Sequence, residues 1–262
     1  MNGLLNLILT YCYRVIGMNK LKSVKNRYIE IKNKNIDEYV KSEKDAEKFA
    51  YGLNFCKLFW VFLIGCVAGT VLETFWAFIT LGRFEIRTGL VIGPFIPVYG
   101  GGAVLMTVFF YRLYKLHDVA IFAISALLGS SFEFLCSFLQ EKIVGTISWD
   151  YSGTFLNIGG RTNFMFGFIW GLLGLCWVRF VYPSLSRFIE KIPKKIGYRL
   201  TVILVMFMLI DSLLSVAAIW RQNERSQGIP SSNSIENFLD SYLDDDYLDF
   251  VYPHMSRPDN KK

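Results

Sequence analysis

Five long apolar runs constrain this chain more than any other feature of its sequence. They cover residues 60–81, 96–114, 119–139, 163–181 and 200–220. Each is close to the roughly 20 residues that an α-helix needs to cross a bilayer. Hydrophobic residues make up 53% of the chain, which excludes a disordered protein. The pattern predicts an all-α fold: a polytopic membrane helical bundle with about five transmembrane spans.

The first four runs contain two similar stretches, which we interpret as a duplicated helical hairpin. Each stretch has a helix with an inward acid, an outer loop that ends in Arg-Thr, and a glycine-rich return helix. The matched residues of the first and second copy are Gly69 and Gly129, Glu73 and Glu133, Arg87 and Arg161, and Gly93 and Gly167. One span separates the first helices of the copies, so both enter the membrane in the same direction. We therefore expect residues 60–114 and 119–181 to superpose as two parallel hairpins.

Charged residues divide the chain into segments with different expected roles. Lysine and arginine gather before the first span and in a loop after the fourth, which holds Arg179 and Arg187. Because cytoplasmic segments carry the excess of Lys and Arg, we expect both regions inside and the acidic C-terminal region outside. The predicted segments are a basic amphipathic cytoplasmic segment at 1–54, the duplicated-hairpin membrane core at 55–182, a basic cytoplasmic loop with the fifth span at 183–220, and a flexible acidic external tail at 221–262. Within that tail, the spacing of apolar residues predicts a short helix at 235–250.

Glu73 and Glu133 are acids inside apolar runs, and Asp211 is a third. A charge at that depth costs at least about 2.5–3.5 kcal/mol, so these side chains should face protein or water. In one interpretation they line a polar site for a cation, a proton or a cationic group, while the arginines bind an anionic group. In the other, they pair with Arg87 and Arg161 and only hold the two repeats together. Both interpretations predict that the acids and arginines converge in one cluster.

Two sets of residues define the candidate site. The first set supplies polar side chains for substrate binding, with Tyr99 and Asp150 expected at its rim: Glu73, Arg87, Tyr99, Glu133, Asp150, Arg161 and Asn163. The second set allows close helix packing or breaks the backbone at the start of the second span: Gly69, Gly93, Pro94, Pro97, Gly100, Gly129 and Gly167. Irregular backbone at membrane depth is tolerated only when it is buried in protein or lines a cavity.

Several function classes have no support in the sequence. The five cysteines show no metal-ligand spacing, and His117 and His254 lie far apart, so we expect no metal and no cofactor. No glycine-rich phosphate loop is present, so the chain is not expected to be an ATPase subunit. The basic charge flanks the membrane runs, which suits anionic lipid rather than nucleic acid.

The motifs together resemble those of a known bacterial family, over roughly residues 55–182. They are Glu73, Arg87, Gly93-Pro94, Pro97-x-Tyr99-Gly100, Ser148-Trp149-Asp150-Tyr151 and Gly160-Arg161-Thr162-Asn163. This set resembles the membrane proteins described as putative ABC-transporter type IV. The resemblance implies a multi-pass permease of the bacterial cell membrane. The chain departs from importer permeases in having no convincing loop of the EAA type, through which such permeases contact their ATPase. ATP coupling therefore stays open.

Three functions follow from these observations. The leading one is an integral membrane transport component, permease-like, with a buried Glu/Arg polar site between the two hairpins. The first alternative is a membrane-embedded enzyme acting on a lipid or lipid-linked substrate, although a non-enzymatic role is favoured. The second alternative is a non-catalytic scaffold. The lipid bilayer is the expected partner. An ATPase subunit, another membrane protein and a second copy of the chain are further candidates.

Overall fold

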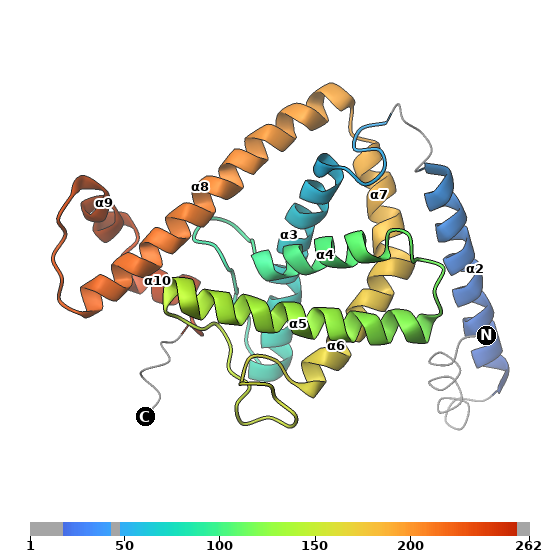
Figure 1. Ribbon diagram of the computed structural model, residues 1–262, viewed down its shortest axis with the longest axis horizontal. Helices are drawn as coiled ribbons and strands as arrows, with labels where there is room; N and C mark the ends of the chain where they lie inside the picture. Colours follow the sequence, from blue (N-terminus) through green and yellow to red (C-terminus); the bar gives the residue numbers. More distant parts are fainter. Residues whose placement is uncertain (1–17, 43–47, 256–262) are drawn as a thin grey trace. The chain divides into compact units, whose positions relative to one another are not determined.

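The computed structural model describes residues 18–42 and 48–255, and this part of the chain is helical without strands. Figure 1 shows the elements along the chain. They are α2 (Met18–Ser42), α3 (Phe55–Leu81), α4 (Pro97–Phe110), α5 (Asp118–Val144), α6 (Phe164–Cys176), the π-helical segment η1 (Trp177–Val181), α7 (Tyr182–Glu190), α8 (Lys194–Ser226), α9 (Ser234–Tyr242) and α10 (Asp245–Val251). The prediction of an all-helical fold is confirmed.

Four helical stretches are long and apolar enough to cross a membrane. They are Phe55–Leu81, Asp118–Val144, Phe164–Glu190 and Lys194–Ser226, and Pro97–Phe110 is a shorter apolar helix. All five apolar runs of the sequence are therefore helical, as predicted. The second run is shorter than expected because its helix begins at Pro97 and ends at Phe110, and an irregular segment precedes it.

The chain divides into two compact units, each built from three segments. Unit 1 contains Met1–Val61, Ala103–Ser131 and Phe164–Arg199. Unit 2 contains Phe62–Gly102, Phe132–Asn163 and Leu200–Lys262. Because α3, α4, α5 and α8 each contribute to both units, the two units share their long helices.

Unit 1 is organised around buried residues of α4, α5, α6 and η1. Its apolar core contains Met106, Phe110, Ile121, Trp170 and Val178. Helix α2 packs against α7 and η1, where the ring of Tyr28 lies edge-on to Phe180 at 5.6 Å. The described part of the basic N-terminal segment thus packs against other helices of unit 1. Residues 1–17 and 43–47 of the segment predicted at 1–54 lie outside the described residues.

The same helix–helix contacts occur once in each unit. In unit 2, Gly69 lies against Tyr99 and Gly100 against Phe62. In unit 1, Gly129 lies against Trp170 and Gly171 against Phe122. The matching residues in units 2 and 1 are Phe62 and Phe122, Gly69 and Gly129, Tyr99 and Trp170, and Gly100 and Gly171. In the second helix of each hairpin, these contacts match Gly100 with Gly171. This alignment differs from the one in the sequence analysis, which matched Gly93 with Gly167. Superposition of the complete hairpins stays a prediction.

The C-terminal segment is folded over most of its length, whereas the sequence predicted a flexible tail. Leu239 of α9, Leu248 of α10 and Leu243 between the two helices are buried with Val91 and Ala218 in unit 2. Figure 1 shows both helices near the C-terminal end of α8. The predicted helix at 235–250 is present as two helices, because Asp244 starts a new one by accepting a hydrogen bond from the Tyr247 N–H.

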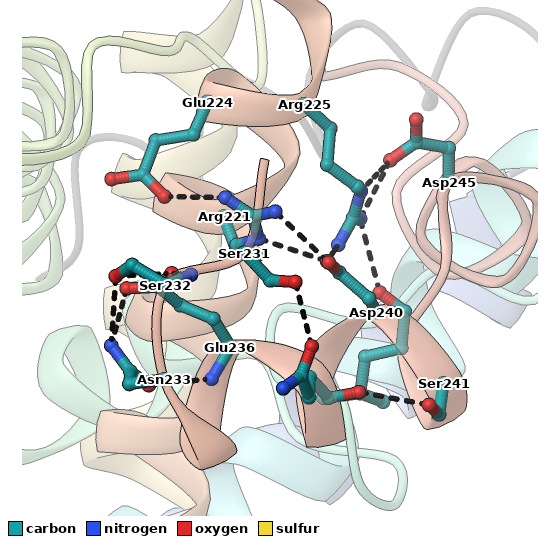
Figure 2. A network of polar contacts seen from close by, with 12 residues as sticks. Arg221, Glu224, Arg225, Ser231, Ser232, Asn233, Glu236, Asp240, Ser241 and Asp245 are labelled. Atoms are coloured by element: carbon teal, nitrogen blue, oxygen red, sulfur yellow. Dashed lines mark hydrogen bonds and ion pairs between the residues drawn. The ribbon is translucent and has the colours of Figure 1, made fainter. Parts of the chain in front are cut away.

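Ion pairs join α9 to the end of α8. The guanidinium of Arg221 donates to both carboxylate oxygens of Asp240, each at 2.9 Å. Arg225 contacts Asp240 at 2.7 Å and Asp245 at 2.6 Å. Figure 2 shows this network, in which the two arginines share Asp240. Bidentate arginine–carboxylate geometry is specific, so it fixes the orientation of α9 on α8.

Candidate functional site

Glu73 lies on α3 and is held by a tyrosine and an arginine. The Tyr99 hydroxyl donates to Glu73 Oε1 at 2.6 Å, and Arg87 Nη1 donates to Oε2 at 3.3 Å. Tyr99 reaches this position because Gly69 leaves room: a Cβ at residue 69 would lie 2.6 Å from Tyr99 Cβ. The side chains of Arg87 and Glu73 keep 22% and 25% of their surface exposed. The predicted Glu73–Arg87 pair is present, and it is partly accessible.

The segment between α3 and α4 is irregular, as the Gly/Pro pattern suggested. Gly93 has a φ of +77°, a conformation that side chains with a Cβ rarely adopt. The Gly89 N–H donates to the Phe95 carbonyl at 2.8 Å, and the Ile96 N–H donates to the Cys66 carbonyl at 3.2 Å. Pro94 follows in this turn, and Pro97 begins α4, where its missing N–H is harmless.

Glu133 is buried on α5 and is held by two hydroxyl groups of the loop at 145–163. Thr162 Oγ1 donates to Glu133 at 2.8 Å and the Tyr151 hydroxyl at 3.2 Å. Burial, followed by the charge of Glu133, raises the pKa of Tyr151 well above its usual range, and the charge of Glu73 acts in the same direction. Tyr151 therefore stays protonated, and both carboxylates lie close enough to act on it.

The loop at 145–163 is ordered by its own hydrogen bonds. The Tyr151 N–H donates to the Gly160 carbonyl at 2.7 Å, and the Trp149 indole donates to the Arg161 carbonyl at 2.9 Å. Gly160 has a φ of +68°, and a Cβ there would lie 2.6 Å from Asp150 Oδ1. The close approach allowed by this glycine brings Tyr151 and Thr162 to Glu133.

The sequence suggested that Arg161 pairs with Glu133. In the structure, Arg161 has a different carboxylate partner. Its guanidinium pairs with Glu141, further along α5, and donates to Ser137 Oγ at 3.2 Å. It also lies over the Phe138 ring, 5.6 Å from the centroid. The longer second loop places this arginine beside the end of α5 rather than at the depth of the buried acid.

Asp150 and Asn163 make contacts within the loop. Asp150 Oδ1 accepts from the Ser152 N–H at 2.9 Å and from its hydroxyl at 2.5 Å. The Asn163 amide donates to Thr154 Oγ1 at 2.8 Å. Both side chains thus shape the loop that carries Tyr151. Gly167, the last packing glycine, lies close to Ser130 of α5 in unit 1.

Asp211, the third intramembrane acid, is fully buried on α8. Its Oδ1 accepts from the Ile92 N–H at 3.1 Å, whereas its Oδ2 has no hydrogen-bond partner. The next turn of α8 contributes Ser215, whose hydroxyl accepts from the Val91 N–H at 2.9 Å. Helix α8 therefore holds the irregular segment at 91–92 through two consecutive backbone N–H groups.

Sequence reasoning missed a second set of contacts on the loop that carries Arg87. Glu85 lies 2.5 Å from His254 and accepts from Arg83 at 2.8 Å and Arg87 at 3.2 Å. The hydrogen bond with His254, followed by that with Arg83, lowers the pKa of Glu85 to about 2. His254 and Glu85 are far apart in the chain, so no local pattern could have joined them.

Unit 1 buries charges that the sequence had placed in a loop. Arg179 lies in η1, inside a continuous helical stretch, with 1% of its side chain exposed. It contacts Asp118 at 2.8 Å and the carbonyls of Tyr114 and Leu116. Lys32 of α2 reaches the same aspartate at 3.0 Å. The prediction of a loop at Arg179 was wrong, since this residue is helical. A buried arginine needs a carboxylate partner, and the sequence did not indicate one because Asp118 lies 61 residues away.

Lys57 of unit 1 is also fully buried, and it pairs with Glu190 at 2.6 Å and contacts Ser186. Across the part of the chain that the structure describes, no group of three or more His, Cys, Asp or Glu residues could hold a metal ion.

The comparisons agree with this membrane architecture. No curated protein and no solved structure matches the chain. A family model described as "Putative ABC-transporter type IV" matches residues 60–216, which is more than half of the chain. The match extends beyond the resemblance seen at 55–182 and includes Asp211 on α8. The chain is a multi-pass membrane protein, and it belongs to the putative ABC-transporter type IV family.

Proposed function

We propose that the protein is a permease-like membrane transport component. Its polar site is formed in unit 2 by two acid–tyrosine pairs, Glu73 with Tyr99 and Glu133 with Tyr151. The family match and the apolar helices support the membrane transport class. The side-chain geometry of unit 2 supports the location of the site.

One observation carries the proposal: each acid accepts a hydrogen bond of 2.8 Å or less from a neutral hydroxyl group. Glu73 accepts from Tyr99 at 2.6 Å, and Glu133 accepts from Thr162 at 2.8 Å. A hydroxyl donor carries no charge, so its hydrogen bond holds a carboxylate in place without neutralising it. Such an acid can bind a proton or a cationic group of a substrate.

Arg87 supplies the complementary positive charge. It contacts Glu85 at 3.2 Å and Glu73 at 3.3 Å, and both distances exceed the roughly 2.7–2.9 Å of a strong charge-assisted hydrogen bond. A guanidinium shared loosely between two acids can turn to an anionic group of a substrate. The site therefore suits a substrate that carries both charges, or an anion that moves with a proton.

The transport class is tested with the purified full-length chain in liposomes. Uptake of radiolabelled cationic, anionic and zwitterionic solutes is measured with and without a proton gradient. We expect one class to be taken up, and Glu133→Gln and Glu73→Gln to abolish this uptake. The control variant Asp246→Asn, at an exposed position of α10, should keep the uptake. If no solute class is taken up, or if the Gln variants keep the uptake, the transport proposal is wrong.

A non-catalytic scaffold is the second candidate. It is favoured because both carboxylate oxygens of Glu133 already accept hydrogen bonds within the chain. In a scaffold, Glu133→Gln lowers thermal stability, and no solute changes that stability. In a transport protein, the transported solute raises the melting temperature of the wild type but not of the variant. An ATPase subunit is the partner that the family description suggests.

The orientation proposed for the chain has the N-terminus in the cytoplasm and the C-terminus outside. Unit 1 carries 19 Lys and Arg against 8 Asp and Glu, a net charge of +11. Unit 2 carries 9 against 14, a net charge of −5. The positive-inside rule then places the loops of unit 1 in the cytoplasm. In a cysteine-free background, an impermeant thiol reagent should label Ser232→Cys from outside and miss Ser23→Cys, and the reverse result refutes this orientation.

A further inference from the structure

We infer that α9 and α10 of unit 2 form a membrane-interfacial element, with one face inserted into the bilayer. This face, called the interfacial face below, consists of four exposed apolar or aromatic side chains: Ile235, Phe238, Tyr242 and Phe250. Its partner is the lipid of the leaflet that holds the C-terminal end of α8. The inference does not rest on the proposed transport function, because it requires only that α8 spans the membrane.

The first observation is that the protein covers only part of the apolar side of α9. Leu239 is buried in the core of unit 2, whereas Ile235, Phe238 and Tyr242 are 71%, 50% and 70% exposed. Leu239 lies four residues after Ile235 and three before Tyr242, so the buried and exposed residues are neighbours on the helix surface. The rings of Phe238 and Tyr242 contact each other with centroids 4.9 Å apart. The apolar side of α9 is therefore wider than the part that packs on the protein.

The second observation gives the height of α9 relative to the membrane. Residues 200–220 of α8 are apolar and, at roughly 1.5 Å per residue, span about 30 Å, which matches the hydrocarbon core. Arg221 follows this run directly and thus lies in the headgroup layer, with Arg225 one turn further out. Both donate to Asp240 of α9, at 2.9 Å and 2.7 Å (Figure 2). These ion pairs hold α9 at the height of the lipid headgroups.

The third observation is an exposed tryptophan at the same height. Trp220 ends the apolar run of α8 and is 51% exposed, and its indole N–H donates to the Ile143 carbonyl at 3.0 Å. Tryptophan and tyrosine are enriched where a span meets the headgroups, because their rings are apolar with one polar group. Tyr242 and the phenylalanines of the interfacial face add aromatic rings to this level. Exposed apolar side chains at this height meet lipid rather than bulk water.

The charges of α9 and α10 indicate that the contact with lipid is apolar. Residues 234–251 contain six Asp and Glu and neither Lys nor Arg. Such a segment is not attracted to anionic lipid. The acids are used otherwise: Asp240 binds the arginines of α8, and Asp244 caps α10 by accepting from the Tyr247 N–H. Burial of the interfacial face in the acyl chains near the headgroups therefore drives the contact.

Fluorescence quenching by spin-labelled lipid tests the inference with the full-length chain in phosphatidylcholine vesicles. In a cysteine-free background, an environment-sensitive fluorophore is attached at Phe238→Cys or, as the control, at Ser241→Cys. Ser241 is exposed on the polar side of α9, where its hydroxyl donates to the Asn237 carbonyl. A nitroxide just below the headgroup should quench the Phe238→Cys probe at least about twofold more than the control probe, since interfacial helices insert by about 5–10 Å. Iodide in the water should quench the control probe more strongly.

Equal quenching of the two probes by lipid overturns the inference. If both lipid nitroxides and iodide fail to reach the Phe238→Cys probe, a second copy or another protein covers this face, and the lipid assignment is wrong. Tyr242→Cys offers a second exposed position if Phe238→Cys fails to fold, and its probe should show the same preference for lipid. High salt should leave the lipid quenching unchanged, whereas its loss in high salt would contradict an apolar contact.

Discussion

Unit 1 buries ion pairs of which both members are buried, whereas unit 2 buries two acids that accept hydrogen bonds from neutral groups. In unit 1, Arg179 and Lys57 are almost or fully buried, and each is matched by a carboxylate within 2.8 Å. In unit 2, Glu133 and Asp211 are buried, and their described partners are hydroxyl groups and a backbone N–H. The net charges of the two units, +11 and −5, follow the same division.

This difference separates structural charges from charges that can change. A buried ion pair with complete partners is costly to disturb, because removal of one member leaves an isolated charge. An acid that accepts hydrogen bonds from neutral groups can be neutralised by a proton, which lowers the cost of its burial. On the proposed function, stability rests on the buried ion pairs of unit 1, and exchangeable chemistry rests on the buried acids of unit 2.

The largest expected effect is at the buried pair of unit 1. Asp118→Asn leaves Arg179 without its carboxylate and should destabilise the protein by about 3–5 kcal/mol. The folded yield in detergent, measured by size-exclusion chromatography, should fall sharply. The double variant Asp118→Asn with Arg179→Met should lose less than the two single variants together. The control Arg112→Gln, at an exposed position, should keep the wild-type yield. Equal losses in Arg112→Gln and Asp118→Asn would show that the buried pair stabilises unit 1 no more than an exposed charge does.

The next effect compares equivalent glycines of the two units. A Cβ added at Gly69 would meet Tyr99, and one added at Gly129 would meet Trp170. Overpacking costs about 1–3 kcal/mol, and the better helix propensity of alanine returns about 1 kcal/mol of it. Gly69→Ala and Gly129→Ala should therefore lower the melting temperature by similar amounts. Gly153→Ala is the control, because a Cβ there meets nothing within 4 Å. A loss at only one of the two helix positions would contradict the duplicated hairpin.

The helices and the charged contacts show which parts of the structure the sequence could predict. Hydropathy located every apolar helix, since the length and composition of a span are local properties. The spacing of Glu73 and Arg87 predicted their pairing because a short loop joins them. The partner of Arg161 was missed, since the second loop is longer and its path depends on hydrogen bonds such as that from Tyr151 to the Gly160 carbonyl. The contact of His254 with Glu85 spans most of the chain, and no periodicity records it.

A smaller effect is expected at the Glu73–Arg87 pair of unit 2. Both side chains are partly exposed, and Tyr99 also holds Glu73, so loss of the arginine does not leave a lone buried charge. A double-mutant cycle of Glu73→Gln and Arg87→Gln should give a coupling free energy below about 1 kcal/mol. A coupling as large as that of Asp118 with Arg179 would show that this pair belongs with the structural charges.

The smallest effect concerns the acid sensitivity of the loop that carries Arg87. The contacts of Glu85 with His254 and Arg83 hold its folded-state pKa at about 2, below its ordinary value of 4.5. The folded state therefore favours the ionised carboxylate. The resulting stability is fully present above pH 4.5 and is lost as the pH falls towards 2.

Glu85→Gln removes this titration and should reduce the fall in melting temperature between neutral and acid pH. His254→Gln breaks the same contact from the other side and should reduce the fall in the same way. Because Glu85 lies near the surface, solvent and salt screen the contact and the change should be small. High salt should narrow the difference between wild type and variants. If His254→Gln leaves the acid sensitivity of the wild type intact while Glu85→Gln removes it, the arginines alone hold Glu85, and the C-terminal segment does not stabilise this loop of unit 2.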